Sequence, residues 1–121
     1  MSERQLGAAE AKFADIIWEK QPVPSGVLAK EAEKEFGWKK TTAYTVLKRL
    51  SDKGLFINDG GTVKALISRD EFYSGQSKRF VEESFGGSLP AFLAAFSAGK
   101  GLTAEEVASL RRFVDEYEEG L

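Results

Sequence analysis

The sequence predicts a mainly α-helical chain of the α+β class, in which three helices are followed by a β-hairpin and then by further helices. Two observations carry this prediction. Apolar residues recur at helical spacing through most of the 121 residues. After Gly54 the period shortens toward two in the runs LFIND and VKALIS, which the turn residues DGG separate. Three helices and then a hairpin is the order of elements in a winged helix-turn-helix.

The first two helices are marked by apolar spacing and by their ends. The pattern predicts a helix over residues 8–20, which Pro22 and Pro24 cannot continue because proline has no N–H to donate. Ser25 fits as the N-cap of a second helix over residues 26–36, and the glycine that follows should end it.

A third helix is predicted over residues 40–53. Its apolar stripe has the spacing i, i+3, i+4, i+7, which places one face of the helix against a core: Ala43, Val46, Leu47 and Leu50. The hairpin strands after it would form the wing, with two or three strands in all.

Three more helices are predicted after the hairpin. The pattern S/T-x-x-E, which marks a capping box, occurs at Ser68 before a helix over about 70–85 and at Thr103 before the last helix. Ser88 fits as the cap of a short helix over residues 89–98. In the last helix apolar residues alternate by three and four, as in a coiled-coil seam: Val107, Leu110, Val114, Tyr117 and Leu121.

Composition excludes several classes of function. The chain has no cysteine and no histidine, so it lacks disulfides, thiol nucleophiles, imidazole bases and the usual zinc or copper ligands. No convincing pair of carboxylates replaces them, so we expect neither an enzyme nor a bound cofactor or metal. No apolar run is long enough to span a membrane, and the first residues lack the apolar segment of a secretion signal. We therefore expect a cytoplasmic protein without membrane insertion.

Charge is divided unevenly along the chain. Residues 1–70 carry 12 Lys and Arg against 10 Asp and Glu, whereas residues 71–121 carry 5 against 9. Within residues 38–54 five cations stand against one anion. Such a local basic patch in a chain of net charge −2 favours attraction to phosphate while limiting indiscriminate binding.

The third helix carries an unusual second face. Thr41, Tyr44, Thr45 and Lys48 share the spacing i, i+3, i+4, i+7 opposite the apolar stripe. Threonine is a moderate helix former, but it offers DNA a hydroxyl group and a methyl group. An ordinary solvated face is the alternative, and the helix alone does not decide between the two. The hairpin behind it favours DNA, with these expected contacts: Lys39, Lys40, Thr41, Thr42, Tyr44, Thr45, Lys48, Arg49 and, on the wing, Lys64.

The wing itself is weaker evidence. The stretch NDGGTVK holds one cation, Lys64, and one anion, Asp59. Wing loops that enter a minor groove usually carry more Arg or Lys. A purely structural hairpin is as consistent with this stretch as one that contacts DNA.

The C-terminal helices are rich in aromatic residues, more than three short helices can bury among themselves. The rings pack either on the N-terminal core or on the equivalent helices of a second copy. Avidity favours the homodimer, because two linked DNA-binding modules bind more tightly than one. The residues expected at the dimer interface are Phe80, Phe92, Phe96, Val107, Leu110, Val114 and Tyr117.

Several stretches together resemble the penicillinase-repressor family, the BlaI/MecI/CopY-type winged-helix repressors. These are AEAKFADIIW, TTAYTVLKRLSDKGL, SRDEF, FGGSLPAFLAAF and LTAEEVASLRRFVDE, in the family's order and over nearly the whole chain. The resemblance implies a bacterial homodimer that represses transcription from palindromic DNA operators. It implies a winged-helix DNA-binding domain over residues 1–69 and a helical dimerisation domain over residues 70–121. In some members it also implies a regulatory protease or membrane sensor as a partner.

The chain departs from the family's pattern at several positions. It lacks the cysteine motif of copper-responsive members, which excludes that mode of metal sensing. Antibiotic-responsive members are cut at an Asn-Phe bond, and the matching bond here is Ala95–Phe96. Tyr44 stands where some members have arginine, and Gly7 stands where many have a Ser or Thr cap.

The sequence thus predicts a dimeric, sequence-specific transcriptional repressor whose helix over residues 40–53 enters the major groove of double-stranded DNA. The alternative is a winged-helix module that binds another protein without specific DNA binding. The net acidity and the poorly charged wing fit that alternative.

Overall fold

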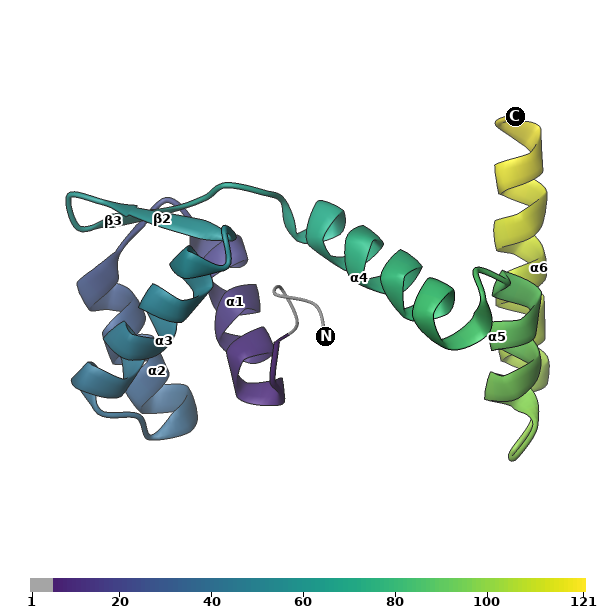
Figure 1. The fold of residues 1–121 in the computed structure, drawn as a ribbon, viewed down its shortest axis with the longest axis horizontal. Helices are drawn as coiled ribbons and strands as arrows, with labels where there is room; N and C mark the ends of the chain where they lie inside the picture. Colours follow the sequence, from purple (N-terminus) through teal and green to yellow (C-terminus); the bar gives the residue numbers. More distant parts are fainter. Residues whose placement is uncertain (1–5) are drawn as a thin grey trace. The chain divides into compact units, whose positions relative to one another are not determined.

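The computed structural model describes residues 6–121, and its elements follow the predicted order (Figure 1). The fold is mainly helical with a small antiparallel sheet, as predicted for a winged helix. In chain order the elements are α1 (Ala8–Lys20), β1 (Val23–Pro24), α2 (Ser25–Phe36), α3 (Lys40–Asp52), β2 (Phe56–Asp59), β3 (Thr62–Ala65), α4 (Arg69–Phe85), α5 (Leu89–Ser97) and α6 (Ala104–Glu119).

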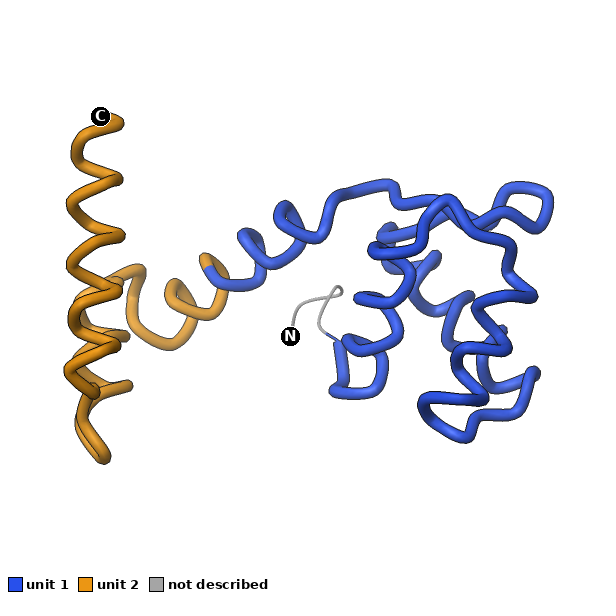
Figure 2. The backbone as a smooth tube through the Cα atoms, turned by 180° about the vertical axis from the view of Figure 1, so that it is seen from behind, with its two compact units in different colours: residues 1–77 blue, residues 78–121 orange. Residues whose placement is uncertain are grey.

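The chain divides into two compact units, residues 1–77 and residues 78–121 (Figure 2). The division falls inside α4, so this helix contributes to both units. The domain boundary expected from sequence, between residues 69 and 70, lies at the first turn of the same helix.

The sheet of the first unit has the strand order β1-β3-β2, with both pairings antiparallel. Asp59 pairs with Thr62 across the two-residue turn Gly60–Gly61, and both glycines have positive φ (61° and 95°). Only glycine adopts such angles without strain, and they are the angles that a tight hairpin turn requires. Asn58 supports the turn, because its side-chain oxygen accepts a hydrogen bond from Gly61 N at 3.0 Å.

One hydrophobic core fills the first unit, with contributions from α1 to α4 and from the sheet. The largest fully buried side chains are Phe13, Ile17, Leu28, Leu50, Leu55, Phe56 and Val63. The apolar stripe of α3 is buried as predicted. Phe13 meets the rings of Phe36 and Trp38 edge to face, at centroid distances of 6.4 and 5.5 Å, so the loop between α2 and α3 is tied to α1.

Most helix ends are the predicted ones. Ser68 Oγ accepts from Glu71 N at 3.0 Å, Ser88 Oγ accepts from Ala91 N at 3.1 Å, and Thr103 forms the predicted capping box. Gly37 ends α2 in the left-handed conformation, with φ of 69°.

The predicted N-cap at Ser25 is wrong. The extended residue that precedes α2 is Pro24, and Ser25 is already the first helical residue. The physical reason is the sheet, because Ser25 N donates to the carbonyl oxygen of Gly61 at 2.8 Å and its hydroxyl lies 3.2 Å from Tyr44 Oη. The serine therefore links α2 to the wing turn and to α3.

The second unit has no comparable interior, since none of residues 78–121 is buried. The end of α4 and α5 share a cluster of rings, in which Phe80, Phe85 and Phe92 lie 5.7 to 5.9 Å apart. Phe113 and Tyr117 of α6 stack at 6.1 Å and are both more than 60% exposed. Within residues 6–121 no helix combines the length and the apolar character needed to cross a membrane.

The core of the first unit should respond to truncation as a packed interior does. Replacing fully buried Leu50 by alanine should lower the free energy of unfolding by about 2–5 kcal/mol, because it leaves a cavity under α3. The matched control is Leu66→Ala at a side chain that is 55% exposed, which should change it by less than about 0.5 kcal/mol. Urea denaturation followed by circular dichroism measures both. Equal effects would contradict the assigned burial of α3.

Candidate nucleic-acid interface

The burial of one face of α3 decides which residues the other face presents. The buried stripe Ala43, Val46, Leu47 and Leu50 holds the helix on the core of the first unit. Since α-helical side chains three and four residues apart share a face, most of the remaining positions point outward. The exposed residues of this helix include Thr41, Thr42, Thr45, Lys48 and Arg49.

The three threonines differ in the hydrogen-bonding groups that they leave free for a partner. Thr45 Oγ1 donates a hydrogen bond to the carbonyl oxygen of Thr41 at 2.9 Å, so the proton of its hydroxyl is already used. The hydroxyls of Thr41 and Thr42 make no hydrogen bond within residues 6–121 and stay available to a partner. Thr45 therefore presents its methyl group and an acceptor, whereas the other two can also donate.

Tyr44 is less exposed than the sequence pattern predicted. The residue is half-buried, packs against the core cluster and shares a hydrogen bond with Ser25 at 3.2 Å. Lys40 Nζ lies 6.0 Å from the centre of the tyrosine ring. The tyrosine thus joins α3 to the first turn of α2 at the margin of the exposed face.

Four cations frame the exposed face. Lys39 and Lys40 lie at its start and Lys48 and Arg49 near its end, all exposed. Lys48 makes an ion pair with Asp52 at 3.4 Å, where its side chain is 79% exposed. An exposed i, i+4 pair of this kind contributes only about 0.3–0.5 kcal/mol, so it competes weakly with a phosphate.

The wing offers little charge. Lys64 projects from β3 and pairs with Asp59 of β2 at 3.9 Å, and the turn between the two strands consists of glycines. Its cation is therefore partly neutralised by its neighbour. The wing thus carries a single lysine, as the sequence indicated.

Two residues that lie beside this face, Ser25 and Lys30, were not predicted there from the sequence. The local pattern marks Ser25 only as a helix cap, and nothing in it indicates the bond to Tyr44, which lies 19 residues away. Lys30 shares with Lys40 the wall of a groove of about 470 Å³ beside the start of α2. The apolar spacing of α2 did not indicate that Lys30 would lie near the start of α3.

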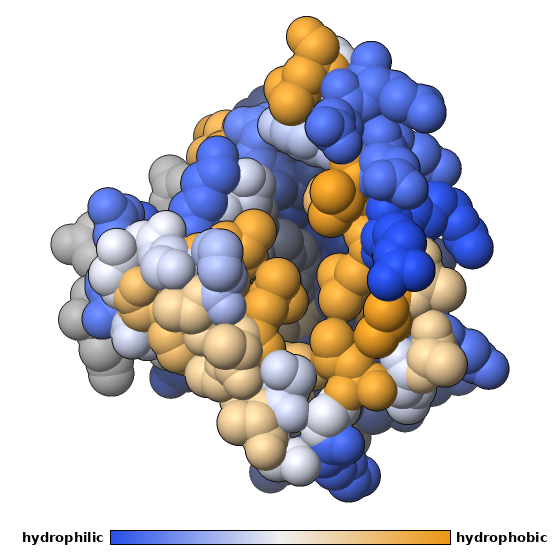
Figure 3. All heavy atoms as spheres, turned by 90° about the vertical axis from the view of Figure 1, so that its right-hand side faces the viewer, coloured by the Kyte–Doolittle hydropathy of each residue, from blue (hydrophilic) through white to orange (hydrophobic). Residues whose placement is uncertain are grey.

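The residues expected at a dimer interface lie in the second unit. Six are exposed in the single chain: Phe80, Phe96, Val107, Leu110, Val114 and Tyr117. Phe92 is partly buried in the ring cluster. Figure 3 shows apolar residues gathered over the α5–α6 region, with polar residues along one edge. Between these helices lies a hollow of about 510 Å³, lined by apolar residues such as Phe92, Phe96 and Leu110.

The candidate cleavage bond Ala95–Phe96 lies inside α5, near its C-terminal end. Both residues are exposed, and Ala95 O accepts a hydrogen bond from Ala98 N at 3.3 Å. In residues 6–121 no group of His, Cys, Asp or Glu side chains is arranged to hold a metal ion.

Comparison with known proteins decides the family. The model of the penicillinase repressor family matches residues 6–116, nearly the whole chain. The chain belongs to the penicillinase repressor family. It is also similar to the methicillin resistance regulatory protein MecI of Staphylococcus aureus, with 24% identity over 116 residues that cover 92% of this chain and 94% of the relative. The resemblance seen in the sequence is confirmed, and the chain is a transcriptional regulator of the repressor kind.

Proposed function

We propose that the chain is a homodimeric repressor that binds a palindromic double-stranded DNA operator, with α3 of each subunit in a major groove. The observation that carries the proposal is the exposed face of α3. It combines threonine hydroxyl and methyl groups, which suit base edges, with lysine and arginine side chains, which suit phosphates. The domain roles expected from sequence follow, with DNA binding in residues 1–69 and dimerisation in residues 70–121.

The second unit supports the dimer. A unit of 44 residues in which no side chain is buried cannot offset the entropy of ordering its chain by its own packing. The apolar stripe of α6 has the three-and-four spacing of a helix seam and is exposed along its length. A second copy would cover this stripe and the hollow beside it, and a two-fold axis would then match a palindromic operator.

The second candidate is a winged helix that binds another protein. The single lysine of the wing, Lys64, which is paired with Asp59, and the net charge of −2 favour it. The two candidates differ in salt dependence, because binding to a polyanion releases counterions and weakens steeply with salt.

In either case the Ala95–Phe96 bond remains a proposed cleavage site for a regulatory protease, which would have to unwind the end of α5 to reach it.

Removing the two cations at the end of α3 should weaken operator binding, most strongly at low salt. The double variant Lys48→Ala, Arg49→Ala should also flatten the plot of log affinity against log salt by about one unit for each phosphate that is no longer neutralised. Gel-shift or fluorescence titrations between roughly 50 and 200 mM salt measure both effects. The control Lys12→Ala, Lys34→Ala removes two charges outside α3 and should leave the slope unchanged. Equal slopes in the two double variants would count against the assigned face.

The methyl group of Thr45 should matter more than its hydroxyl. Thr45→Val keeps the methyl group and should retain operator affinity, whereas Thr45→Ser should lower it by roughly three- to fivefold per half-site. Replacing operator thymine by deoxyuridine should remove the difference if the contact is methyl to methyl. A larger loss for valine than for serine would show that the hydroxyl contacts DNA.

The stripe of α6 should hold the dimer. Leu110→Asp with Val114→Asp places two charges in an apolar seam, so we expect monomers by multi-angle light scattering. Operator affinity should then fall by a factor on the order of 10²–10⁴, because avidity is lost. Ala108→Asp adds a charge to an exposed position of α6 outside the stripe and should remain dimeric. Dimers of the double variant would show that the interface lies elsewhere.

A further inference from the structure

The hydroxyl groups of Ser25 and Tyr44 form a pair at the margin of the exposed face of α3. Their oxygens lie 3.2 Å apart, and either hydroxyl can be the donor. Each carries one proton, and neither makes another side-chain hydrogen bond within residues 6–121. One of the two protons therefore remains free, whichever hydroxyl donates to the other. We call Ser25 and Tyr44 the hydroxyl pair.

Contacts on both sides hold the hydroxyl pair in place. Ser25 N donates to the carbonyl oxygen of Gly61 at 2.8 Å, which ties the backbone of Ser25 to the wing turn. Tyr44 is partly buried and packs against the core of the first unit. Since the core holds the ring and Ser25 holds the hydroxyl, Tyr44 cannot turn toward the middle of the exposed face without losing both contacts.

The position of Tyr44 on α3 indicates the kind of contact that it can make. Thr41 and Thr45 lie opposite the buried stripe, while Tyr44 lies to one side, next to α2. The major groove is only about 12 Å wide, so a helix within it turns the middle of its outer face to the base edges. The margins of the same helix then lie nearest the two phosphate backbones. Tyr44 is therefore placed for a phosphate rather than for a base.

Positive charge lies on the same margin. Lys40 Nζ is 6.0 Å from the centre of the Tyr44 ring. Lys40 and Lys30 also line the groove of about 470 Å³ beside the start of α2, whose wall includes one carboxylate, that of Glu33. Both lysines are exposed, and neither makes an ion pair within residues 6–121. Two ammonium groups against one carboxylate leave a net positive charge here, which attracts a phosphate.

We propose that the hydroxyl pair donates its free proton to a phosphate oxygen of the DNA backbone, and that Tyr44 does not read a base. This inference rests on the proposed function as a DNA-binding protein. Lys30 and Lys40 add attraction to the same stretch of backbone. Because phosphate oxygens carry no sequence information, the hydroxyl pair contributes equally to binding on every base sequence.

The first test separates a phosphate contact from a base contact. The double variant Ser25→Ala, Tyr44→Phe removes both hydroxyls but keeps the packed ring and the backbone bond to the wing turn. On an operator duplex selected from random DNA, its affinity should fall roughly three- to tenfold per half-site in fluorescence titrations. The loss should be the same factor on duplexes that carry single base-pair changes. A loss that depends on the identity of one base pair would overturn the proposal.

Neutral backbone analogues identify the phosphate that is contacted. A methylphosphonate placed at one backbone position removes the charge and one acceptor oxygen of that phosphate. The wild type should lose affinity at the phosphate that accepts the free proton. The double hydroxyl variant should lose roughly three- to tenfold less there, because its contact is already gone. The variant Lys48→Ala, Arg49→Ala should keep the wild-type loss at this position. Equal losses in the wild type and the double hydroxyl variant at every phosphate would contradict the inference.

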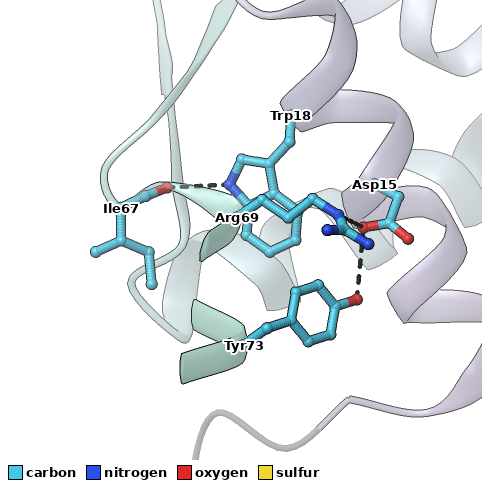
Figure 4. A network of polar contacts seen from close by, with 5 residues as sticks. All are labelled: Asp15, Trp18, Ile67, Arg69 and Tyr73. Carbon is cyan, nitrogen blue, oxygen red and sulfur yellow. Dashed lines mark hydrogen bonds and ion pairs between the residues drawn. The ribbon is translucent and has the colours of Figure 1, made fainter. Parts of the chain in front are cut away.

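Tyr73 provides a matched control outside the exposed face of α3. Its hydroxyl donates to Asp15 Oδ1 at 3.4 Å, and Arg69 Nε donates to the same oxygen at 3.0 Å (Figure 4). Burial raises the pKa of the Tyr73 phenol, the Asp15 carboxylate raises it further and Arg69 acts in the opposite direction, so the hydroxyl stays protonated at neutral pH. Tyr73→Phe removes a hydrogen-bonded phenol hydroxyl of the same kind and should leave DNA affinity unchanged.

The outcomes distinguish this inference from the proposed function. A wild type that binds no duplex in a salt-dependent manner would contradict the proposed function, and the inference with it. A wild type that binds as proposed, with unchanged affinity in a folded double hydroxyl variant, would overturn the inference alone. Circular dichroism checks the fold. If the double variant is unfolded, Ser25→Ala and Tyr44→Phe replace it singly, and unchanged affinity in both would overturn the inference.

Discussion

The burial of the apolar stripe of α3 is the constraint on which the rest of the molecule depends. Ala43, Val46, Leu47 and Leu50 are held in a core built by α1, α2 and the sheet, so the helix cannot turn its opposite face inward. That face is therefore fixed in orientation before any partner arrives. A preorganised surface loses less conformational entropy on binding, because its backbone is already ordered. An exposed face of hydroxyl groups and cations on such a helix therefore suits the recognition of a polyanion.

The two units differ in how many side chains they bury. The first buries a continuous core of aliphatic and aromatic side chains, whereas the second buries none and exposes the apolar stripe of α6. The first unit has a packed core of its own, whereas the second is completed in our proposal by its counterpart in a second subunit. The boundary between the two units falls inside α4, whose start is bonded to α1 through Asp15 and whose end belongs to the second unit.

The sequence predicted those features that depend on local signals. The α3 stripe, the caps at Ser88 and Thr103 and the glycine turn of the hairpin all follow from short-range spacing or from single residues with special φ and ψ angles. Contacts between distant segments were not predictable. Asp15 meets Arg69 and Tyr73 across 54 and 58 residues, and no periodicity marks such a pairing. Ser25 is a second example of a contact that could not be predicted. A serine before a helix has the sequence pattern of a cap, whether or not its hydroxyl bonds to a distant residue such as Tyr44.

The most direct test of the account is to map the DNA-contacting surface by NMR. Uniformly ¹⁵N-labelled protein would be titrated with an operator duplex obtained by selection from random DNA, and amide shift changes would be assigned along the chain. We expect the largest changes at the exposed residues of α3, including Thr41, Thr42, Thr45 and Arg49, and smaller changes at the start of α2. Changes confined to α5 and α6, with α3 unaffected, would contradict it.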